Sequence, residues 1–445
     1  TLAPREELEH PDHTALTVHT DLNKTCASFA RFSPRDADTY RRLIGEAQGY
    51  MDLLVRTLMF AAPIDLDDIT RALVAWGVAE RSEFLTVKLR KMSVADFLDQ
   101  HFENDRIKAM LAFHAAICAY QPHVKGLAVS YPLLLGKMTN WHLCKGGSHR
   151  LAHALMRVIV KLGGRVFPQV PVEEIVVKNG RAMGVRTPDG FVAAHKLVAS
   201  SVDVHQTFQT LLRPEHVPAT TAREVAEVRY QDNSLFNVHL ALNDVPRYHA
   251  ADFDPDIDRA WIVNLGYECL ADFAEDFAAA RQGRLGERPR LNVAVNSLYD
   301  PTDAPEGMAT GLLRVFAPYE LAGQGPEGWD TAKNAYASAC VTRWLAACKN
   351  RDALVRKWAC ETPWDIARKI INYRHGDWMV GRIHPDNLLS ERPTRELANY
   401  RTPIAGLYLC GASQHPHGYI TFAPGYNALG AIADDLGLER WWDKI

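Results

Sequence analysis

The first third of the chain carries apolar side chains at helical spacing. Between residues 20 and 160, one helix is expected to begin at Ser33-Pro34, because serine caps helices and proline is favoured at the first helical position. A second start is expected at Ser93, which is followed three positions later by an acidic residue, a variant of the capping box. Residues 104–120 are apolar nearly all round, which is typical of a buried helix. We therefore expect this region to be mostly helical.

After Gly147 the pattern changes to short β-rich runs. A helix is expected over 149–162, and runs of strand length follow it. Asn-Gly and Asp-Gly pairs at 179–180 and 189–190 separate three of these runs, as in consecutive hairpins. The sequence thus predicts a helix, a strand, a three-stranded meander and a returning strand, with β-rich runs at 165–167, 172–177, 182–186 and 191–199.

The rest of the chain mixes strands with helices and contains no internal repeat or low-complexity tract. Apolar runs and alternating runs predict further strands, and the chain ends in a strand, a loop and a helix. Together with the helical first third, this order predicts a mixed α/β fold. The expected strands are 235–242, 291–298, 312–318 and 406–410, and the expected helices are 329–348 and about 427–436.

Composition and charge fit an ordinary globular protein. Of the 445 residues, 47% are apolar and 23% are charged, so we expect a large core and two or three domains. The net charge of −3 gives no general attraction to nucleic acid, and no nucleic-acid partner is expected. The sequence has no run of 18 apolar residues, so we expect no membrane-spanning helix.

The cysteines and histidines predict no metal site. The eight cysteines form no C-x-x-C pair, which favours reduced thiols and a cytoplasmic location over a disulfide framework or a zinc site. His149 and His153 are four residues apart on the expected helix but lack the glutamate of a metalloprotease motif.

The strand and loop at the C-terminal end carry the clearest chemistry. The strand at 406–410 ends in the small residues Gly411, Ala412 and Ser413, which allow a ligand to approach the backbone closely. A loop with two prolines and two glycines follows, and then the start of a helix, whose free N–H groups suit a phosphate or an electron-rich ring edge. A plain strand–turn–helix of an α/β core fits these residues equally well.

Segment 406–429 resembles the C-terminal signature of the phytoene desaturase-like FAD-dependent oxidoreductases. That signature runs Gly-Leu-Tyr, Cys-Gly, His-Pro, Ala-Pro-Gly and Asn-Ala. Segments around 145–147, 172–175 and 200–205 are also similar to the family, and the resemblance covers nearly the whole chain. The matching residues are Gly406, Leu407, Tyr408, Cys410, Gly411, His415, Pro416, Gly418, Ala423, Pro424, Gly425, Asn427 and Ala428.

The resemblance implies a glutathione-reductase-like α/β fold that binds FAD. By the family's pattern, the backbone of Val172 contacts the adenine end, and Gly411 and Ala412 lie along the ribityl–pyrophosphate part. The loop from His415 to Gly425 faces the isoalloxazine ring. The implied cofactor-binding residues are Val172, Gly411, Ala412, His415, Pro416, Gly418, Ala423, Pro424, Gly425 and Asn427.

The resemblance also implies two interleaved domains and a missing piece. The family opens with a Rossmann unit whose G-x-G-x-x-G turn holds the pyrophosphate, and our interpretation assigns that turn to no segment of this sequence. We expect another chain or fragment to supply this N-terminal dinucleotide-binding unit, which makes the protein a heteromer. The expected parts are an extension (1–19), a substrate domain (20–145 and 213–394), a FAD domain (146–212 and 395–437) and a tail (438–445).

The chain departs from the family in the loop over the flavin. Where the family has a run of glycines, this sequence has His417, Tyr419 and the nearby Phe422. Bulky side chains there narrow the space above the ring, which favours a small or medium substrate over a long carotenoid. Tyr419 and His417 are the candidate catalytic residues, for substrate contact or proton transfer. The alternative is a loop histidine and a packing tyrosine.

The predicted function is therefore FAD-dependent oxidation of a small or medium apolar substrate, with hydride transfer to flavin N5. The chain is expected to be catalytic only with the missing FAD-binding part. Two alternatives remain open: an amine or alcohol oxidase that uses oxygen, and a non-catalytic partner subunit that kept the fold. Trp441-Trp442 fits either a peripheral membrane contact or packing of the terminal helix.

Overall fold

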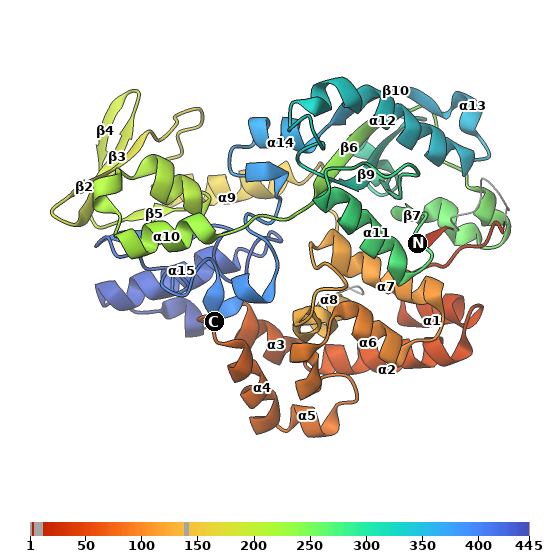
Figure 1. The fold of residues 1–445 in the computed structure, drawn as a ribbon, viewed down its shortest axis with the longest axis horizontal. Helices are drawn as coiled ribbons and strands as arrows, with labels where there is room; N and C mark the ends of the chain where they lie inside the picture. The colour runs from red at the N-terminus through yellow and green to blue at the C-terminus, as the bar shows by residue number, and fades with distance from the viewer. Residues whose placement is uncertain (1, 4–11, 138–141, 445) are drawn as a thin grey trace. The chain divides into compact units, whose positions relative to one another are not determined.

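The computed structural model describes residues 2–3, 12–137 and 142–444. The chain divides into two compact units, each assembled from three separate stretches of sequence. The first unit comprises residues 1–48, 91–166 and 232–369, and the second comprises residues 49–90, 167–231 and 370–445 (Figure 1). Part of the expected extension, 1–19, lies outside the described residues. The last residue of the expected tail, 438–445, also lies outside them.

A six-stranded sheet forms the centre of the first unit. Its order is β1-β7-β8-β9-β6-β10, and its neighbouring strands pair antiparallel except for β1 and β7. Three of the expected strands are confirmed as β6, β8 and β9, although β8 ends early, at Ala294, before a short 3-10 turn. The strands are β1 (Leu2–Ala3), β6 (Ser234–Leu242), β7 (Ile262–Leu265), β8 (Leu291–Ala294), β9 (Ala309–Ala317) and β10 (Val355–Glu361).

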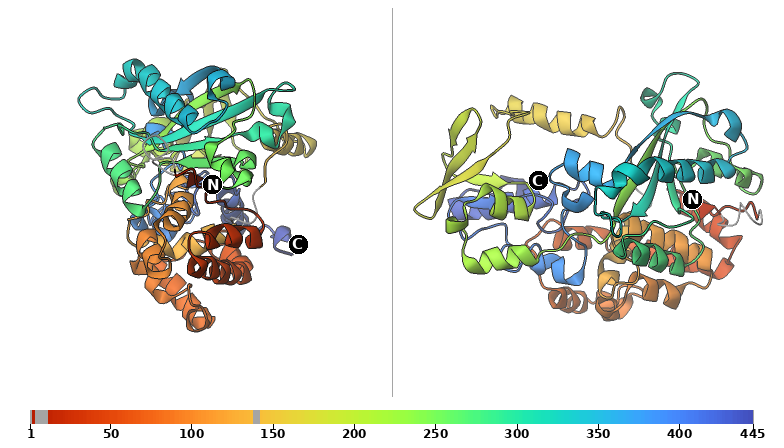
Figure 2. Two further views of the ribbon diagram at one scale, coloured as in Figure 1. Left: turned by 90° about the vertical axis from the view of Figure 1, so that its right-hand side faces the viewer. Right: turned by 45° about the horizontal axis from the view of Figure 1, so that its top comes forward.

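One face of this sheet packs against a long helix. Residues of β6 alternate between buried and more open positions, as a strand with one face in the core should. Its Phe236 stacks on Trp329 of α12 (Gly328–Ala346) with ring centroids 5.3 Å apart, and Trp344 of the same helix is fully buried. Figure 2 shows α12 on one side of the sheet and α7 (Asp105–Ile117) on the other.

The helices of the first unit begin where their capping residues predict. Ser33 accepts a hydrogen bond of 3.1 Å from the Asp36 N–H at the start of α2, and Ser93 forms a capping box with Asp96. Helix α7 is buried on most sides, as expected. These helices are α1 (Leu22–Ala30), α2 (Pro34–Gly49), α6 (Val94–His101), α8 (Tyr131–Gly136), α9 (His149–Lys161), α11 (Leu270–Arg281), α13 (Arg351–Leu354) and α14 (Pro363–Lys369).

The second unit contains the expected meander and a parallel strand pair. Strands β2, β3 and β4 form an antiparallel three-stranded sheet, and β5 pairs in parallel with β11. The strands are β2 (Glu174–Lys178), β3 (Arg181–Thr187), β4 (Gly190–Ala193), β5 (Val198–Ser200) and β11 (Leu407–Leu409). The helices are α3 (Met51–Leu58), α4 (Leu66–Ala75), α5 (Val78–Arg81), α10 (Ala219–Glu227) and α15 (Ala423–Leu436).

Three local predictions need correction. The expected strand at 165–167 is absent from this described stretch, since two glycines precede it and Pro168, which has no N–H to donate to a sheet, follows it. The run 191–199 divides into β4 and β5, because the chain leaves the antiparallel meander to pair in parallel with β11. Helix α15 starts a turn before Asn427, since Pro424 suits a first helical turn.

A literal G-x-G-x-x-G sequence occurs at Gly323–Gly328, which corrects our assignment of that pattern to no segment. It lies between β9 and α12, where Leu321 and Gly325 form an isolated bridge. In a dinucleotide-binding unit the strands before and after the helix belong to a parallel βαβ sheet. Here β9 and β10 flank β6, and both pair with it antiparallel. The turn therefore follows a strand of an antiparallel sheet and lacks the dinucleotide-binding context.

Two further features complete the fold. In the described residues, every helix is too short or too polar to cross a bilayer. Near the C-terminus, the rings of Trp441 and Trp442 meet edge to face with centroids 5.8 Å apart, and Trp441 is 62% exposed. The two compact units have boundaries at 166–167, 231–232 and 369–370, whereas the expected domain boundaries were 145–146, 212–213 and 394–395. Residues 49–90, which were expected in the substrate domain, belong to the second unit.

Candidate functional site

The site of the sequence signature starts at the end of β11 in the second unit. All three residues of β11 are buried, and each pairs with a residue of β5. Because the carboxyl ends of parallel strands meet at one edge, Gly411 comes against Ser201. A Cβ on Gly411 would lie 2.0 Å from the Ser201 carbonyl oxygen, so this position accommodates glycine alone. The small residue therefore allows the two backbones to meet.

The loop after Gly411 is held in a compact shape by its own backbone. The Gln414 N–H donates to the Gly411 carbonyl over 3.0 Å, and the His417 N–H donates to the Gln414 carbonyl over 2.8 Å. From outside the loop, the Tyr400 hydroxyl donates to the carbonyl of His415 over 3.1 Å. These bonds fix the backbone of the loop without using the loop's own side chains.

Arg392 clamps the loop from within the core of the second unit. Its side chain is fully buried, and its guanidinium donates to the carbonyls of Ala412 and Met379, each over 2.9 Å. The same segment is held by the buried Asp377 carboxylate, which accepts from the N–H groups of Met379 and Gly381 over 2.8 and 3.1 Å. Burial raises the pKa of Asp377. No local pattern in the sequence marks this clamp, because its partners are backbone carbonyls distant in the chain.

Four residues of the loop adopt left-handed backbone conformations without being glycine. Their φ angles are 99° for His417, 69° for Tyr419, 56° for Ile420 and 61° for Phe422. Such conformations are costly for bulky side chains and cluster at functional sites. The rings of His417 and Tyr419 meet edge to face with centroids 4.9 Å apart. The loop thus presents two adjacent rings where the family pattern has glycines.

Both histidines of the loop are buried. His415 is 2% exposed and His417 is 8% exposed. Burial lowers the pKa of His415 to about 4 and holds the pKa of His417 well below 6.5, and the positive charge of Arg392 adds to the shift of His417. Both rings are therefore neutral at pH 7. The catalytic role expected of His417 stays a prediction, and if it holds the ring acts as a neutral base.

The start of α15 offers open backbone. Ala423 and Pro424 are buried, whereas Gly425 is exposed and a Cβ on it would meet nothing within 4 Å. The N–H groups of a helix's first turn lack partners inside the helix and attract electron-rich groups. Asn427 points elsewhere, since its amide donates to the Met59 carbonyl over 2.9 Å. The backbone at Gly425, rather than the Asn427 side chain, is open to a ligand.

Val172 lies on a different element of the same unit. It is 41% exposed and precedes β2, and its neighbour Glu173 donates an N–H to the Arg186 carbonyl. The meander joins the strand of the loop through the Ala182 N–H, which donates to the Ala405 carbonyl over 2.9 Å. No hydrogen bond among the described residues joins Val172 to the loop itself. Its role toward adenine stays a prediction.

A second polar network supports the loop from β5. The Asp203 carboxylate accepts from the Tyr230 hydroxyl over 2.7 Å, and the same hydroxyl lies 2.6 Å from Nδ1 of His205. The Val204 N–H donates to the Ser413 hydroxyl over 3.2 Å, which ties this network to the loop. Asp203, His205 and Tyr230 are all buried, so the network positions the backbone and is closed to a substrate.

Gln414 is a residue that the sequence reasoning missed. Its side chain is 1% exposed, and both polar atoms of its amide are buried without a hydrogen-bond partner among the described residues. An unpartnered buried amide is costly and indicates a ligand that both donates and accepts. The edge of an isoalloxazine ring, with its carbonyl and N–H groups, has that chemistry. With Gly411 and Gly425, Gln414 makes the loop a fit for the flavin part of FAD.

Comparison with protein families identifies the class. The family described as flavin containing amine oxidoreductase matches residues 11–300. The chain belongs to this family. Membership in these flavin-containing oxidoreductases confirms the expected FAD cofactor and the oxidoreductase class.

Several curated relatives of this flavin oxidoreductase extend along most of its length. A limonene dehydrogenase subunit of Castellaniella defragrans is 28% identical over 97% of this chain and 80% of the relative. Pyridine nucleotide-disulfide oxidoreductase domain-containing protein 2 of Mus musculus is 28% identical over 95% of this chain and 77% of its own. A neurosporene-forming phytoene desaturase of Cereibacter sphaeroides is 26% identical over 93% of this chain and 75% of its own. The resemblance to phytoene desaturases is thus confirmed.

Solved structures support the fold of the flavin oxidoreductase. An oxidoreductase from Methanosarcina mazei has a TM-score of 0.51 at 14% identity, covering 83% of this chain and 72% of its own. A redesigned putrescine oxidase has a TM-score of 0.50 at 13% identity, and the match covers 84% of this chain and 74% of the oxidase. At these identities the likeness concerns the fold alone, and it confirms the mixed α/β class.

Proposed function

We propose that this protein is a FAD-dependent dehydrogenase or desaturase that oxidises a small or medium apolar substrate by hydride transfer to flavin N5. The observation that carries the proposal is the loop after β11. There the backbones of His417 and Tyr419 have φ angles that favour glycine, and their two rings lie side by side. When bound, FAD supplies the two-electron acceptor, while the protein supplies binding and orientation. A relative named as a dehydrogenase of limonene, a small apolar compound, supports the substrate class.

Within this proposal each part of the loop has its own role. Gly411 lets β11 meet the end of β5, which places the backbone from Ala412 onward beside the cofactor. Gln414 and the first turn of α15 bind the cofactor's polar edges. Pro416 and Gly418 shape the loop between the two rings. Tyr419 and His417 form a wall that orients the substrate C–H bond and excludes water.

A desaturation also releases a proton from the carbon next to the one that loses hydride. Neutral His417 is the basic group that the loop holds against Tyr419. Its lowered pKa makes it a weak base. A weak base suffices here, because a carbon that is losing hydride becomes electron-poor and makes the C–H bond on its neighbour more acidic. His417 is therefore the proposed proton acceptor, and Tyr419 orients the substrate.

The charge of the loop argues against the competing oxidase reaction. An amine or alcohol oxidase that uses oxygen is the second candidate function, and the family description favours it. A protonated amine would be expected to meet a carboxylate, but residues 410–422 contain no aspartate or glutamate. A neutral apolar substrate therefore suits this loop better.

The proposal includes a partner that completes the FAD site. In the second unit, β5 and β11 form a parallel sheet of two described strands, whereas parallel sheets are normally larger and covered on both faces. In the first unit, α9 has no buried residue, although its apolar side chains include Leu155 and Ile159. Both features are consistent with another chain or fragment that adds a dinucleotide-binding unit. The naming of one relative as part of a multi-chain dehydrogenase supports this interpretation.

Anaerobic flavin reduction tests the function. The complete holoprotein would be mixed with cyclic terpenes, cyclic amines and alcohols, and loss of the oxidised flavin absorbance would be followed. Reduction by terpenes but not by amines supports the proposal, and reduction by amines alone replaces it with the oxidase. Failure of the complete assembly to bind FAD would leave the alternative of a non-catalytic partner.

A further inference from the structure

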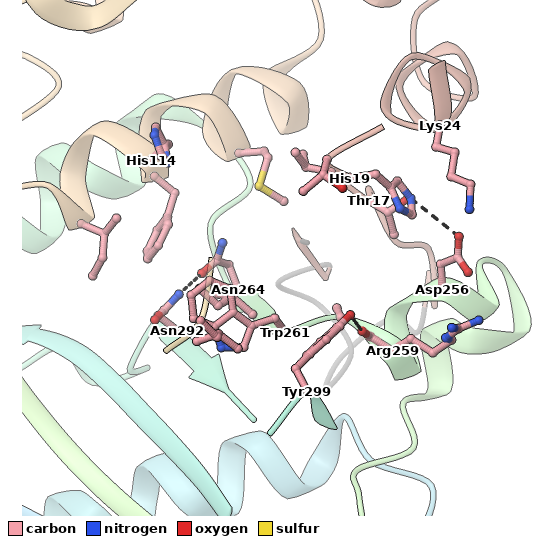
Figure 3. Close-up of a pocket in the computed structure, with 18 of the residues that line it drawn as sticks. Thr17, His19, Lys24, His114, Asp256, Arg259, Trp261, Asn264, Asn292 and Tyr299 are labelled. Atoms are coloured by element: carbon pink, nitrogen blue, oxygen red, sulfur yellow. Dashed lines mark hydrogen bonds and ion pairs between the residues drawn. The ribbon is translucent and has the colours of Figure 1, made fainter. Parts of the chain in front are cut away.

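The first unit contains a cavity that neither the sequence signature nor the proposed flavin chemistry uses. Its volume is about 670 Å³, within the range of small-molecule pockets. One wall is α7 and another is the face of the sheet opposite α12. Figure 3 shows Asn264, Asn292 and Trp261 grouped on the sheet side and His114 on the helix side. Every lining residue belongs to the first unit.

A row of polar side chains crosses the sheet beneath this cavity. Asn264 of β7 pairs with Asn292 of β8, which pairs with Arg314 of β9, so the three side chains share one face. The preceding row, Val263, Val293 and Leu313, points to the other face and is buried in the core. Three polar residues in register on the cavity side are unexpected for a wall that serves packing alone.

Arg314 is the centre of this row. Among the described residues its guanidinium has no hydrogen bond and no ion pair, and its Nε is buried without a partner. Burial lowers the pKa of Arg314 to about 10. Arg290, two residues from Asn292, is satisfied by contrast, since it pairs with Asp272, Glu275 and Asp276. A half-buried guanidinium without an acceptor is costly, which indicates that a ligand supplies one.

The carboxylates that line the cavity leave the charge of Arg314 unneutralised. Asn292 donates its amide to Asn264 over 2.6 Å, and its buried oxygen is an acceptor that adds nothing to the attraction for an anion. Neither lining carboxylate pairs with Arg314, since Asp21 caps α1 and Asp256 lies 3.7 Å from His19. The positive charge of Arg314 is therefore not compensated within the cavity.

The other walls favour an apolar body. Met110, Phe113 and Ile117 of α7 face the cavity, with Trp261 and Ile262 on the sheet side. His114 adds no charge, because burial lowers its pKa to about 4 while its Nε2 lies 3.2 Å from the Leu134 carbonyl. Arg259 at this cavity is exposed, so Arg314 is the guanidinium that lies among these apolar walls. Such a group suits a monoanion with a hydrocarbon chain better than a strongly hydrated phosphate.

We propose that this cavity is a carboxylate-binding site, in which Arg314 binds the carboxyl group of an apolar carboxylic acid whose hydrocarbon part packs against α7. Planar guanidinium and carboxylate groups pair through two parallel hydrogen bonds. The site goes beyond the proposed function and stands without it, because no residue of the flavin loop takes part.

Calorimetric titration of the purified protein with octanoate tests the site. Octanoate is expected to bind, and octanamide, which keeps the chain but lacks the charge, is expected to bind roughly ten- to 100-fold more weakly. The R314Q variant should lose octanoate affinity by a similar factor, and the matched variant R259Q, which removes an exposed arginine at the same cavity, should keep it.

Three results would overturn the proposal. These are equal binding of octanoate and octanamide, unchanged octanoate binding by R314Q, and phosphate binding as tight as that of octanoate. Circular dichroism would establish that R314Q is folded. If R314Q does not fold, the comparison of octanoate with octanamide on the wild-type protein decides the question. Flavin content and flavin reduction are not measured in this experiment, so its failure leaves the proposed function untouched.

Discussion

The guanidinium of Arg392 donates a hydrogen bond of 2.9 Å to the carbonyl oxygen of Ala412, which follows shortly after β11. The same side chain also reaches the carbonyl of Met379 over 2.9 Å. A buried arginine therefore holds the backbone of the loop that we assign to the flavin. Its removal would leave several carbonyls in the core without a donor, so the loop and the stability of the second unit depend on one side chain.

Replacing Arg392 by lysine should destabilise the protein. Lysine keeps the charge but lacks the planar guanidinium that donates to several carbonyls at once. We therefore expect a loss of roughly 1–3 kcal/mol in the free energy of unfolding. The measurement is denaturant unfolding followed by circular dichroism. Arg395→Lys is the matched control, because Arg395 pairs with Glu391 and Asp65 at the surface and should cost about 0–1 kcal/mol. Equal losses in the two variants would contradict the clamp.

Replacing Gly411 by alanine should damage the junction between β5 and β11. The new Cβ would fall 2.0 Å from the Ser201 carbonyl oxygen, and forcing the two backbones apart should cost about 1–3 kcal/mol. Bound FAD per chain should also fall, since the backbone at Gly411 moves. Gly49→Ala, at the end of α2, is the control, because nothing lies within 4 Å of its Cβ and it is outside the loop. A G411A variant with the melting temperature and FAD content of G49A would refute this account.

Tyr419→Phe and His417→Ala should slow flavin reduction without loss of FAD. The first change removes the hydroxyl that orients the substrate, and the second removes the proposed proton acceptor. General acid–base catalysis contributes about 10²–10⁴-fold, so we expect His417→Ala to have the larger effect. Stopped-flow absorbance under anaerobic conditions measures the rate. Tyr50→Phe, in the same unit but at the start of α3, is the control. Wild-type rates in both loop variants would remove the two residues from the mechanism.

Stability should fall when the protein is acidified below about pH 6.5. Burial lowers the pKa of His114 and of His415 to about 4, so each ring stays neutral in the folded protein while the unfolded chain binds a proton. Between the unfolded pKa of about 6.5 and the folded pKa of about 4, proton binding favours the unfolded state. The free energy of unfolding then falls by about 1.4 kcal/mol per pH unit for each histidine as the pH is lowered. Stability from these groups is complete above their unfolded pKa.

Denaturant unfolding at pH 7, 6 and 5 measures this slope. His114→Asn should make it shallower by the contribution of one histidine. A variant with the wild-type slope would show that His114 is not held neutral by burial.

Local signals in the sequence predict the elements that depend on neighbours in the chain. Ser33 and Ser93 cap helices where their side chains indicate, and the meander β2–β4 turns where Asn-Gly and Asp-Gly pairs occur. The strand, loop and helix at the C-terminal end follow from a set of matching residues at fixed spacing between 406 and 428. These features require no knowledge of distant contacts.

Features that depend on contacts distant in the chain could not be predicted from the sequence. Arg314 has polar neighbours only after β7, β8 and β9 pair in register, and nothing near it in the chain marks it as unpaired. Arg392 and Gln414 likewise acquire their roles through burial. The G-x-G-x-x-G at Gly323–Gly328 shows the converse, since a literal motif without its parallel strands has no dinucleotide-binding context.

The uncovered helix α9 has a consequence for handling the protein. Its Leu151, Leu155, Val158 and Ile159 are between 38% and 53% exposed, in a helix that has basic residues at both ends. Apolar patches on this scale promote self-association, so solutions of the chain should become turbid as concentration rises. Chaperones that bind exposed hydrocarbon would retain the chain during synthesis. The yield of monodisperse protein, read by light scattering, therefore reports whether this surface has been covered.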